Sequence, residues 1–190
     1  MNPERDEVLF ESRFLSLYRR DGWYEYIHNT KGKGSGVMVL IYDLSNAEEP
    51  KILGRYEHTP SHESGYTPEG KITEDRLVYL TSITGQMDKV GKTHAEVALE
   101  EVYEEAGIYA ELDELEYLGD VYPSKASDTK IKMFALNGHG KFMGPVGGDG
   151  SAGERGSFAM WETARLVIEQ SNCPMVGMAY SKLLFNKNLM

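Results

Sequence analysis

Three glutamates, Glu101, Glu104 and Glu105, are spaced at i, i+3 and i+4, which places their carboxylates on one patch if the segment is helical. Like charges about 5 Å apart repel by roughly 1 kcal/mol in water, and by more where water is partly excluded. Such a patch favours a bound cation, and carboxylate oxygens are typical ligands of Mg²⁺ or Mn²⁺. The alternative is an ordinary acidic face in contact with solvent, and the flanking sequence decides between the two.

The segment around these glutamates carries signals for both ends of a helix. Thr93 followed three residues later by Glu96 forms a capping box, and Gly107 is the usual left-handed stop. The apolar positions between them fall on another side of the helix: Ala95, Ala98, Leu99, Val102 and Ala106. The sequence therefore predicts a helix between Thr93 and Gly107 that docks against a sheet.

From Gly85 onward the chain reads Gly-Gln-Met-Asp-Lys-Val-Gly-Lys-Thr-His-Ala-Glu-Val-Ala-Leu-Glu-Glu-Val-Tyr-Glu-Glu-Ala-Gly-Ile, which resembles the box of the Nudix hydrolases. That box is Gly-x5-Glu-x7-Arg-Glu-U-x-Glu-Glu-x-Gly-U, with U apolar. Its second half is matched by Glu101, Val102, Glu104, Glu105, Gly107 and Ile108. The resemblance implies that the three glutamates bind the divalent ions that activate a diphosphate, and that Glu104 belongs to the catalytic carboxylates.

The first half of the box departs from the family pattern. Gly85 lies one residue too early, Lys92 stands at the position of the family's first glutamate, and Glu100 stands at the position of its arginine. If those two family residues form an ion pair that braces the loop against the helix, Lys92 and Glu100 are the same pair with the signs exchanged. The alternative is that both side chains are exposed and unpaired.

Composition agrees with a compact, soluble enzyme. With 190 residues, 41% of them hydrophobic, the chain can bury a full core, and we expect one domain with an N-terminal extension. No apolar run is long enough for a membrane span and the N-terminus does not resemble a targeting segment, so we expect a cytoplasmic protein. The single cysteine, Cys173, excludes an internal disulfide. A formal charge of −10 argues against nucleic-acid binding and means that an anionic diphosphate needs a metal-loaded site.

Strand and helix signals alternate along the chain. The expected strands are 8–19 and 22–29, joined by a hairpin turn, then 37–42, 51–56, 76–83, 130–136 and 157–161, followed by helices 162–170 and 175–187. Strand 37–42 is apolar throughout, which is typical of a strand buried on both faces. The alternation predicts an α/β protein, and the resemblance implies the Nudix-type α/β/α sandwich with a mixed sheet and an N-terminal β-hairpin extension.

The order of elements also resembles the branch of the family that cleaves ADP-ribose and nucleoside diphosphate sugars. We expect residues 1–35 to be a strand extension and 36–190 to be the hydrolase domain. That branch usually forms dimers through its N-terminal strands, so the resemblance implies a homodimer.

Two residues outside the box are candidates for substrate binding. Arg55 lies in a stretch that resembles the family's phosphate-facing segment, although a strand arginine often pairs with surface acids instead. Trp23 could stack on a base across a dimer interface, or it could simply belong to a packed face of the hairpin. Among the histidines only His58 and His62 have a spacing typical of metal ligands, and Pro60 between them argues against the helix that would place both rings on one face. No histidine is therefore predicted to bind a metal.

The glycine-rich segment 138–156 is expected to be a mobile loop. In the resembling branch a glutamate before the last strand activates the attacking water, and Glu154 occupies a comparable place, with Asp149 next in line. Glu154 could equally be an exposed loop carboxylate.

The resemblance implies a Mg²⁺-dependent hydrolase that splits a nucleotide sugar or ADP-ribose into a nucleoside monophosphate and a sugar phosphate. Because Lys92 and Glu100 replace two box residues, a nucleotide-sugar-binding module with reduced or no activity is the alternative. A structural domain whose acidic helix binds nothing is a third reading.

Overall fold

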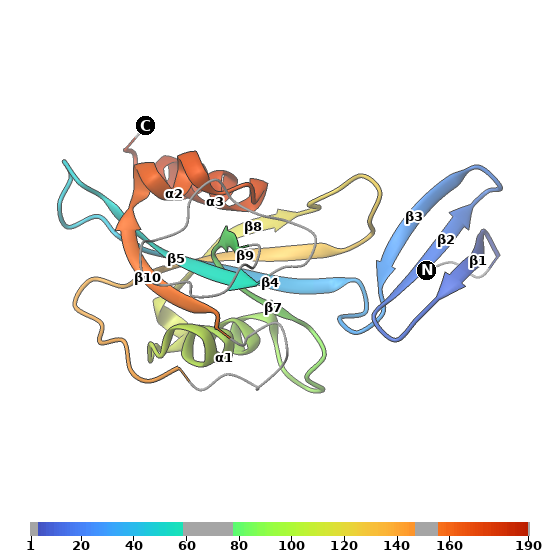
Figure 1. The fold of residues 1–190 in the computed structure, drawn as a ribbon, viewed down its shortest axis with the longest axis horizontal. Helices are drawn as coiled ribbons and strands as arrows, with labels where there is room; N and C mark the ends of the chain where they lie inside the picture. The colour runs from blue at the N-terminus through green and yellow to red at the C-terminus, as the bar shows by residue number, and fades with distance from the viewer. Residues whose placement is uncertain (1–3, 59–77, 147–155, 190) are drawn as a thin grey trace.

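The computed structural model describes residues 4–58, 78–146 and 156–189. These residues form two β-sheets and the helices that cover the larger one (Figure 1). In the described part of the chain no helix is both long and apolar enough to cross a lipid bilayer. Asp149 and Glu154 lie outside the described residues.

The smaller sheet is antiparallel and lies at one end of the molecule (Figure 1). It consists of β1 (Asp6–Glu11), β2 (Leu15–Arg20) and β3 (Tyr24–Asn29). The predicted turn between β2 and β3 is present, since Asp21 and Gly22 both adopt left-handed backbone angles. The prediction of one strand over 8–19 is wrong, because the chain reverses at Ser12, whose Oγ accepts hydrogen bonds from the backbone amides of Phe14 and Leu15.

The larger sheet is mixed. Within the described residues its strands are β4 (Ser35–Asp43), β5 (Lys51–His58), β6 (Val78–Thr81), β7 (Ile83–Gln86), β8 (Leu115–Val121), β9 (Lys130–Asn137) and β10 (Phe158–Thr163). The main order is β10-β5-β4-β9-β8, with β6 paired to β5 and β7 paired to β4. The β4–β9 pair is parallel and the other pairs are antiparallel. Strand β4 is buried from Gly36 to Tyr42, as its continuous apolar run predicts.

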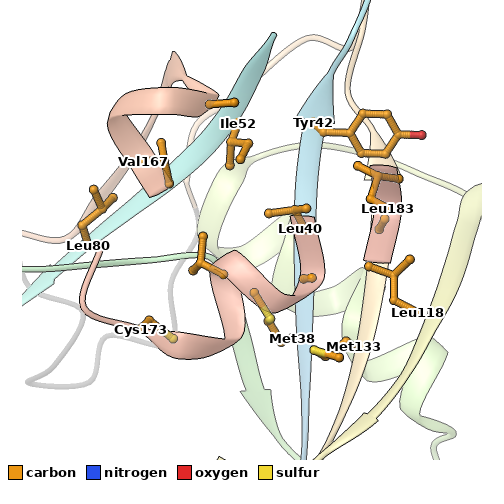
Figure 2. Packing of buried hydrophobic residues seen from close by; sticks show 14 of the residues in the cluster. Met38, Leu40, Tyr42, Ile52, Leu80, Leu118, Met133, Val167, Cys173 and Leu183 are labelled. Atoms are coloured by element: carbon orange, nitrogen blue, oxygen red, sulfur yellow. The ribbon is translucent and has the colours of Figure 1, made fainter. Parts of the chain in front are cut away.

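Helices pack on both faces of this sheet, which gives the predicted α/β/α sandwich (Figure 1). Helix α1 (His94–Ala106) covers one face, and α2 (Ala164–Gln170) and α3 (Pro174–Asn186) cover the other. Side chains of β4 alternate between the two cores. Figure 2 shows the core between the sheet and helices α2 and α3. There Val167 of α2 and Leu183 of α3 lie over the sheet beside Ile52 and Leu40.

Two differences from the sequence prediction affect the larger sheet. The expected strand 76–83 is two strands, because β6 hydrogen-bonds to β5 and β7 crosses over to β4. Strand β8 was not predicted, because its alternation of apolar and polar residues is weak. Its register with β9 shifts at Gly119, whose φ of 112° is rare for a residue with a side chain.

The small sheet is joined to the rest of the protein through the segment between β8 and β9. Ile27 of β3 donates its backbone N–H to Ala126 O at 2.8 Å and accepts from Asp128 N at 3.1 Å. His28 Nδ1 lies 2.9 Å from Asp128 Oδ2 beside these bonds. Because β3 then runs into β4 through a short turn, the small sheet is tied to the larger one at two places along the chain.

Candidate active site

A cavity of about 630 Å³ opens beside α1, at the end of the larger sheet where β4, β5 and β7 meet. Its wall carries acidic and basic side chains together with a smaller apolar part. The charged lining residues are Lys31, Arg55, Glu57, Asp88, Lys89, Glu101, Glu104 and Glu105. All three glutamates singled out in the sequence therefore face the same space.

Local signals place these glutamates where they are. Helix α1 begins at the predicted capping box, in which Thr93 Oγ1 accepts from Glu96 N while the Glu96 carboxylate accepts from Thr93 N. Its apolar side packs Val97, Ala98 and Val102 against the sheet. The same rotation of the helix turns the glutamates toward the cavity.

Glu101 lies against the backbone of β7. A Cβ atom added to Gly85 would lie 2.4 Å from Glu101 Cγ, so a side chain at this position cannot coexist with the present carboxylate position. Gly85 pairs with Val37 of β4, so β7 is held in the larger sheet, and α1 packs against this sheet. The glycine thus allows the helix carboxylate to approach the sheet closely.

Glu105 is the most deeply placed of the three glutamates. Its Oε1 lies 3.4 Å from Arg55 Nη2, and its Oε2 accepts a hydrogen bond from Thr84 N at 3.4 Å. Burial raises the pKa of Glu105 to about 8, Arg55 opposes that rise, and the charges of Glu57 and Glu101 add to it. A buried carboxylate with a raised pKa is a group that an additional cation would stabilise.

Arg55 enters the cavity from β5 and is only 3% exposed. Its Nε has no hydrogen-bond partner among the described residues. Glu57, two residues further along the same strand, also lines the cavity, and burial raises the pKa of its carboxyl group. The arginine therefore belongs to the buried wall of the cavity and is not a surface residue paired with solvent-exposed acids.

Lys89, which is not among the residues predicted from the sequence, also reaches these carboxylates. Its Nζ lies 3.1 Å from Glu100 Oε2, 3.3 Å from Glu104 Oε1 and 3.9 Å from Glu101 Oε1. The residue follows β7 in a segment without helix or strand, so its reach depends on a loop conformation that no spacing rule predicts. The one sequence feature that could have pointed to Lys89 is its position inside the segment that resembles the Nudix box.

Lys92 and Glu100, the proposed exchanged ion pair, are in contact: Lys92 Nζ donates to Glu100 Oε1. Both side chains are partly exposed, and neither lines the cavity. Gly107 has a φ of 64°, and its C=O accepts from Gly144 N at 2.8 Å. A Cβ on Gly107 would lie 2.3 Å from Gly144 O, so this glycine serves both the helix end and a close backbone approach.

One predicted site residue, Trp23, is not brought to the cavity. Trp23 is 75% exposed at the turn between β2 and β3, where its ring packs edge-on against Tyr24. It does not line the cavity of its own chain. Glu154, the predicted base, is outside the described residues, as stated above.

The donor set suits a hard divalent cation. Glu101, Glu104 and Glu105 supply carboxylate oxygens to one cavity, and the buried Glu105 lacks full charge compensation. In their present positions, no three His, Cys, Asp or Glu side chains of the described residues converge as ligands of one ion. Lys89 Nζ lies within 4 Å of two of the three glutamates.

No protein-family model matches this chain, and no curated protein sequence does. Solved structures do resemble it. The crystal structure of an ADP compounds hydrolase aligns over 98% of this chain and 97% of its own, with 14% identity and a TM-score of 0.59. A NUDIX hydrolase from Nitrosomonas europaea aligns over 80% and 89%, with 16% identity and a TM-score of 0.50. The chain therefore has the Nudix hydrolase fold, as the box resemblance implied.

Proposed function

We propose that this protein is a Mg²⁺-dependent hydrolase that cleaves the diphosphate bond of a nucleoside diphosphate linked to another group, such as a nucleotide sugar or ADP-ribose. The observation that carries the proposal is that Glu101, Glu104 and Glu105 line one cavity in a Nudix fold. The likeness to an ADP compounds hydrolase over nearly the whole of both chains supports the choice of substrate class.

Glu101, Glu104 and Glu105 would hold Mg²⁺, which when bound would neutralise the diphosphate and stabilise the charge that develops during hydrolysis. Arg55 fixes the Glu105 carboxylate from the sheet side, and Thr84 N fixes its second oxygen. Both contacts orient a ligand that would otherwise be free to rotate.

The reaction we propose is attack of water at phosphorus. A new P–O bond forms as the bridging P–O bond breaks, and the electron pair of the broken bond stays on the departing phosphate. The carboxylate of Glu154 accepts the proton of the water. The products are a nucleoside monophosphate and a sugar or ribose phosphate.

A substrate panel tests this function directly. Nucleotide sugars, ADP-ribose, dinucleotides and nucleoside triphosphates would each be incubated with the protein and Mg²⁺, and released monophosphate would be measured. We expect release from the linked diphosphates, and its loss in Glu104→Gln by a factor on the order of 10² or more. Glu48→Gln, on an exposed loop away from the cavity, is the matched control and should keep the parent rate. Binding without release by the parent protein would instead favour a nucleotide-sugar-binding module.

We also propose that the protein is a homodimer that associates through its N-terminal sheet. That sheet and its turns, which lie within the described residues 6–29, expose seven large apolar side chains: Val8, Phe10, Phe14, Leu15, Trp23, Tyr24 and Ile27. A second copy would cover them. Light scattering should give twice the monomer mass for the parent, and a monomer for Phe10→Glu; a monomeric parent would contradict the proposal.

A further inference from the structure

Lys89 places its ammonium group among the carboxylates that the proposed function assigns to a metal ion. Its Nζ lies 3.1 Å from Glu100 Oε2, 3.3 Å from Glu104 Oε1 and 3.9 Å from Glu101 Oε1. Lys89 also lines the cavity that Glu101 and Glu104 face. Lys92 is the contrasting residue: it shares the contact with Glu100, but it does not line the cavity. Lys31 lines the cavity too, and its ammonium is paired with Asp88 at 2.9 Å.

A divalent ion held by Glu101 and Glu104 would need the oxygens that Lys89 now approaches. It would also lie within a few ångströms of the lysine nitrogen, where two positive charges repel strongly in a partly buried site. The ammonium and the metal ion therefore exclude each other. Lys89 can move away, since it has a long side chain that is 30% exposed and lies on a segment without helix or strand.

We propose that Lys89 is a built-in competitor for the metal site. In the metal-free protein it compensates the charge of Glu101 and Glu104, and a divalent ion binds by displacing its ammonium group. This inference rests on the proposed function. Its consequence is that the metal affinity is weaker than the carboxylates alone would give, so that Lys89 raises the concentration of divalent ion at which the site fills.

Direct titration with Mn²⁺ alone, with free Mn²⁺ followed by electron paramagnetic resonance, tests the competition without any turnover. Lys89→Met removes the charge and keeps an unbranched side chain of similar length. We expect it to bind Mn²⁺ about tenfold more tightly than the parent, which is in the range usual for coupling between two ligands. Lys92→Met is the matched control and should stay within about twofold, because an exposed ion pair contributes little.

Glu104→Gln separates this proposal from the metal site itself, because the loss of a ligand should weaken Mn²⁺ binding in any case. If Glu104→Gln loses affinity while Lys89→Met matches the parent or binds more weakly, the metal site stands and the competition is overturned. If neither the parent nor Lys89→Met binds Mn²⁺, both proposals fall. Lys89→Gln offers the same comparison should the methionine variant fail to fold.

A second readout uses the unmutated protein. Lysine acetylation by a water-soluble reagent, quantified by mass spectrometry, reports how free each ammonium group is. We expect Mg²⁺ to speed the acetylation of Lys89, because displacement frees its ammonium group from the carboxylates of Glu104 and Glu101. Lys141, which pairs with Glu114 at 2.6 Å outside the cavity, should not respond. An unchanged Lys89 rate in saturating Mg²⁺ would contradict the displacement.

Discussion

Arg55 and Glu105 meet inside the protein, with Arg55 Nη2 3.4 Å from Glu105 Oε1 and both side chains almost fully buried. They come from β5 and α1, so the contact ties the sheet to the helix that carries the proposed metal ligands. The arginine does not fully compensate the buried carboxylate, because the pKa of Glu105 is still raised to about 8 by burial.

This raised pKa predicts how the stability of the metal-free protein depends on pH. Between the ordinary value of 4.5 and about 8, folded Glu105 keeps a proton that the unfolded chain releases. The contribution of Glu105 to the free energy of unfolding is therefore complete below that window, and it falls as pH rises through it, by at most about 1.4 kcal/mol per pH unit. Above about pH 8 the loss is complete.

Urea unfolding in EDTA at about pH 5 and about pH 9 would measure this contribution. We expect the parent protein to lose more stability between the two conditions than Glu105→Gln, whose side chain is neutral throughout. Glu48→Gln, which changes an exposed glutamate, should follow the parent. Equal pH dependence in the parent and Glu105→Gln would show that Glu105 is not protonated in the folded protein.

Gly107 gives a second prediction, because it combines a left-handed backbone with a close contact. Gly107→Ala should cost about 1 kcal/mol or more for the backbone strain, and further stability because the new Cβ would lie 2.3 Å from Gly144 O. Gly91→Ala is the matched control, since Gly91 has a φ of 83° and open space around its Cβ position. We expect Gly107→Ala to be the more destabilised variant in urea unfolding; equal losses would mean that the backbone contact with Gly144 yields easily.

Local signals made much of the fold predictable. The ends of α1 follow from Thr93, Glu96 and Gly107, which act within a few residues of one another. The burial of β4 follows from a run of apolar residues that no exposed strand would carry. The shared position of the three glutamates follows in turn from helix geometry, which explains why the sequence could predict that they face one space.

Other features depend on partners that are distant in the sequence. The break between β6 and β7 arises because each strand pairs with a different neighbour, β5 or β4, and the local sequence does not record that choice. Lys89 reaches Glu104 from a loop position fifteen residues earlier, as the sequence numbering gives. Arg55 of β5 contacts Glu105 of α1, fifty residues later in the sequence. In each case tertiary packing, and not local propensity, decides the contact.

The third prediction concerns Glu154. If its carboxylate accepts the proton of the attacking water, Glu154→Gln should lower kcat by a factor on the order of 10² or more, with a much smaller change in KM. Asp149→Asn, in the same glycine-rich segment, is the matched comparison. Steady-state rates on the best substrate of the panel would decide. A near-parent kcat for Glu154→Gln with a large loss in Asp149→Asn would transfer the role of base to Asp149.

The final prediction concerns Lys92 and Glu100, which are in contact with the charges exchanged relative to the Nudix box. Lys92→Glu places two carboxylates side by side and should lower both activity and thermal stability. Adding Glu100→Arg restores an ion pair in the usual orientation and should recover much of the loss.

A double-mutant cycle on these two positions would measure the coupling directly. We expect about 0.5 kcal/mol or somewhat more, toward the lower end for residues in contact, because both side chains are partly exposed. Lys89 provides an internal check, because its Nζ also lies 3.1 Å from Glu100 Oε2. In a Lys89→Met background Lys92 is left as the lysine paired with Glu100, so the same cycle should give a larger coupling. Additive effects in both backgrounds would show that the contact does not brace the loop, and that the box tolerates these two residues as separate surface charges.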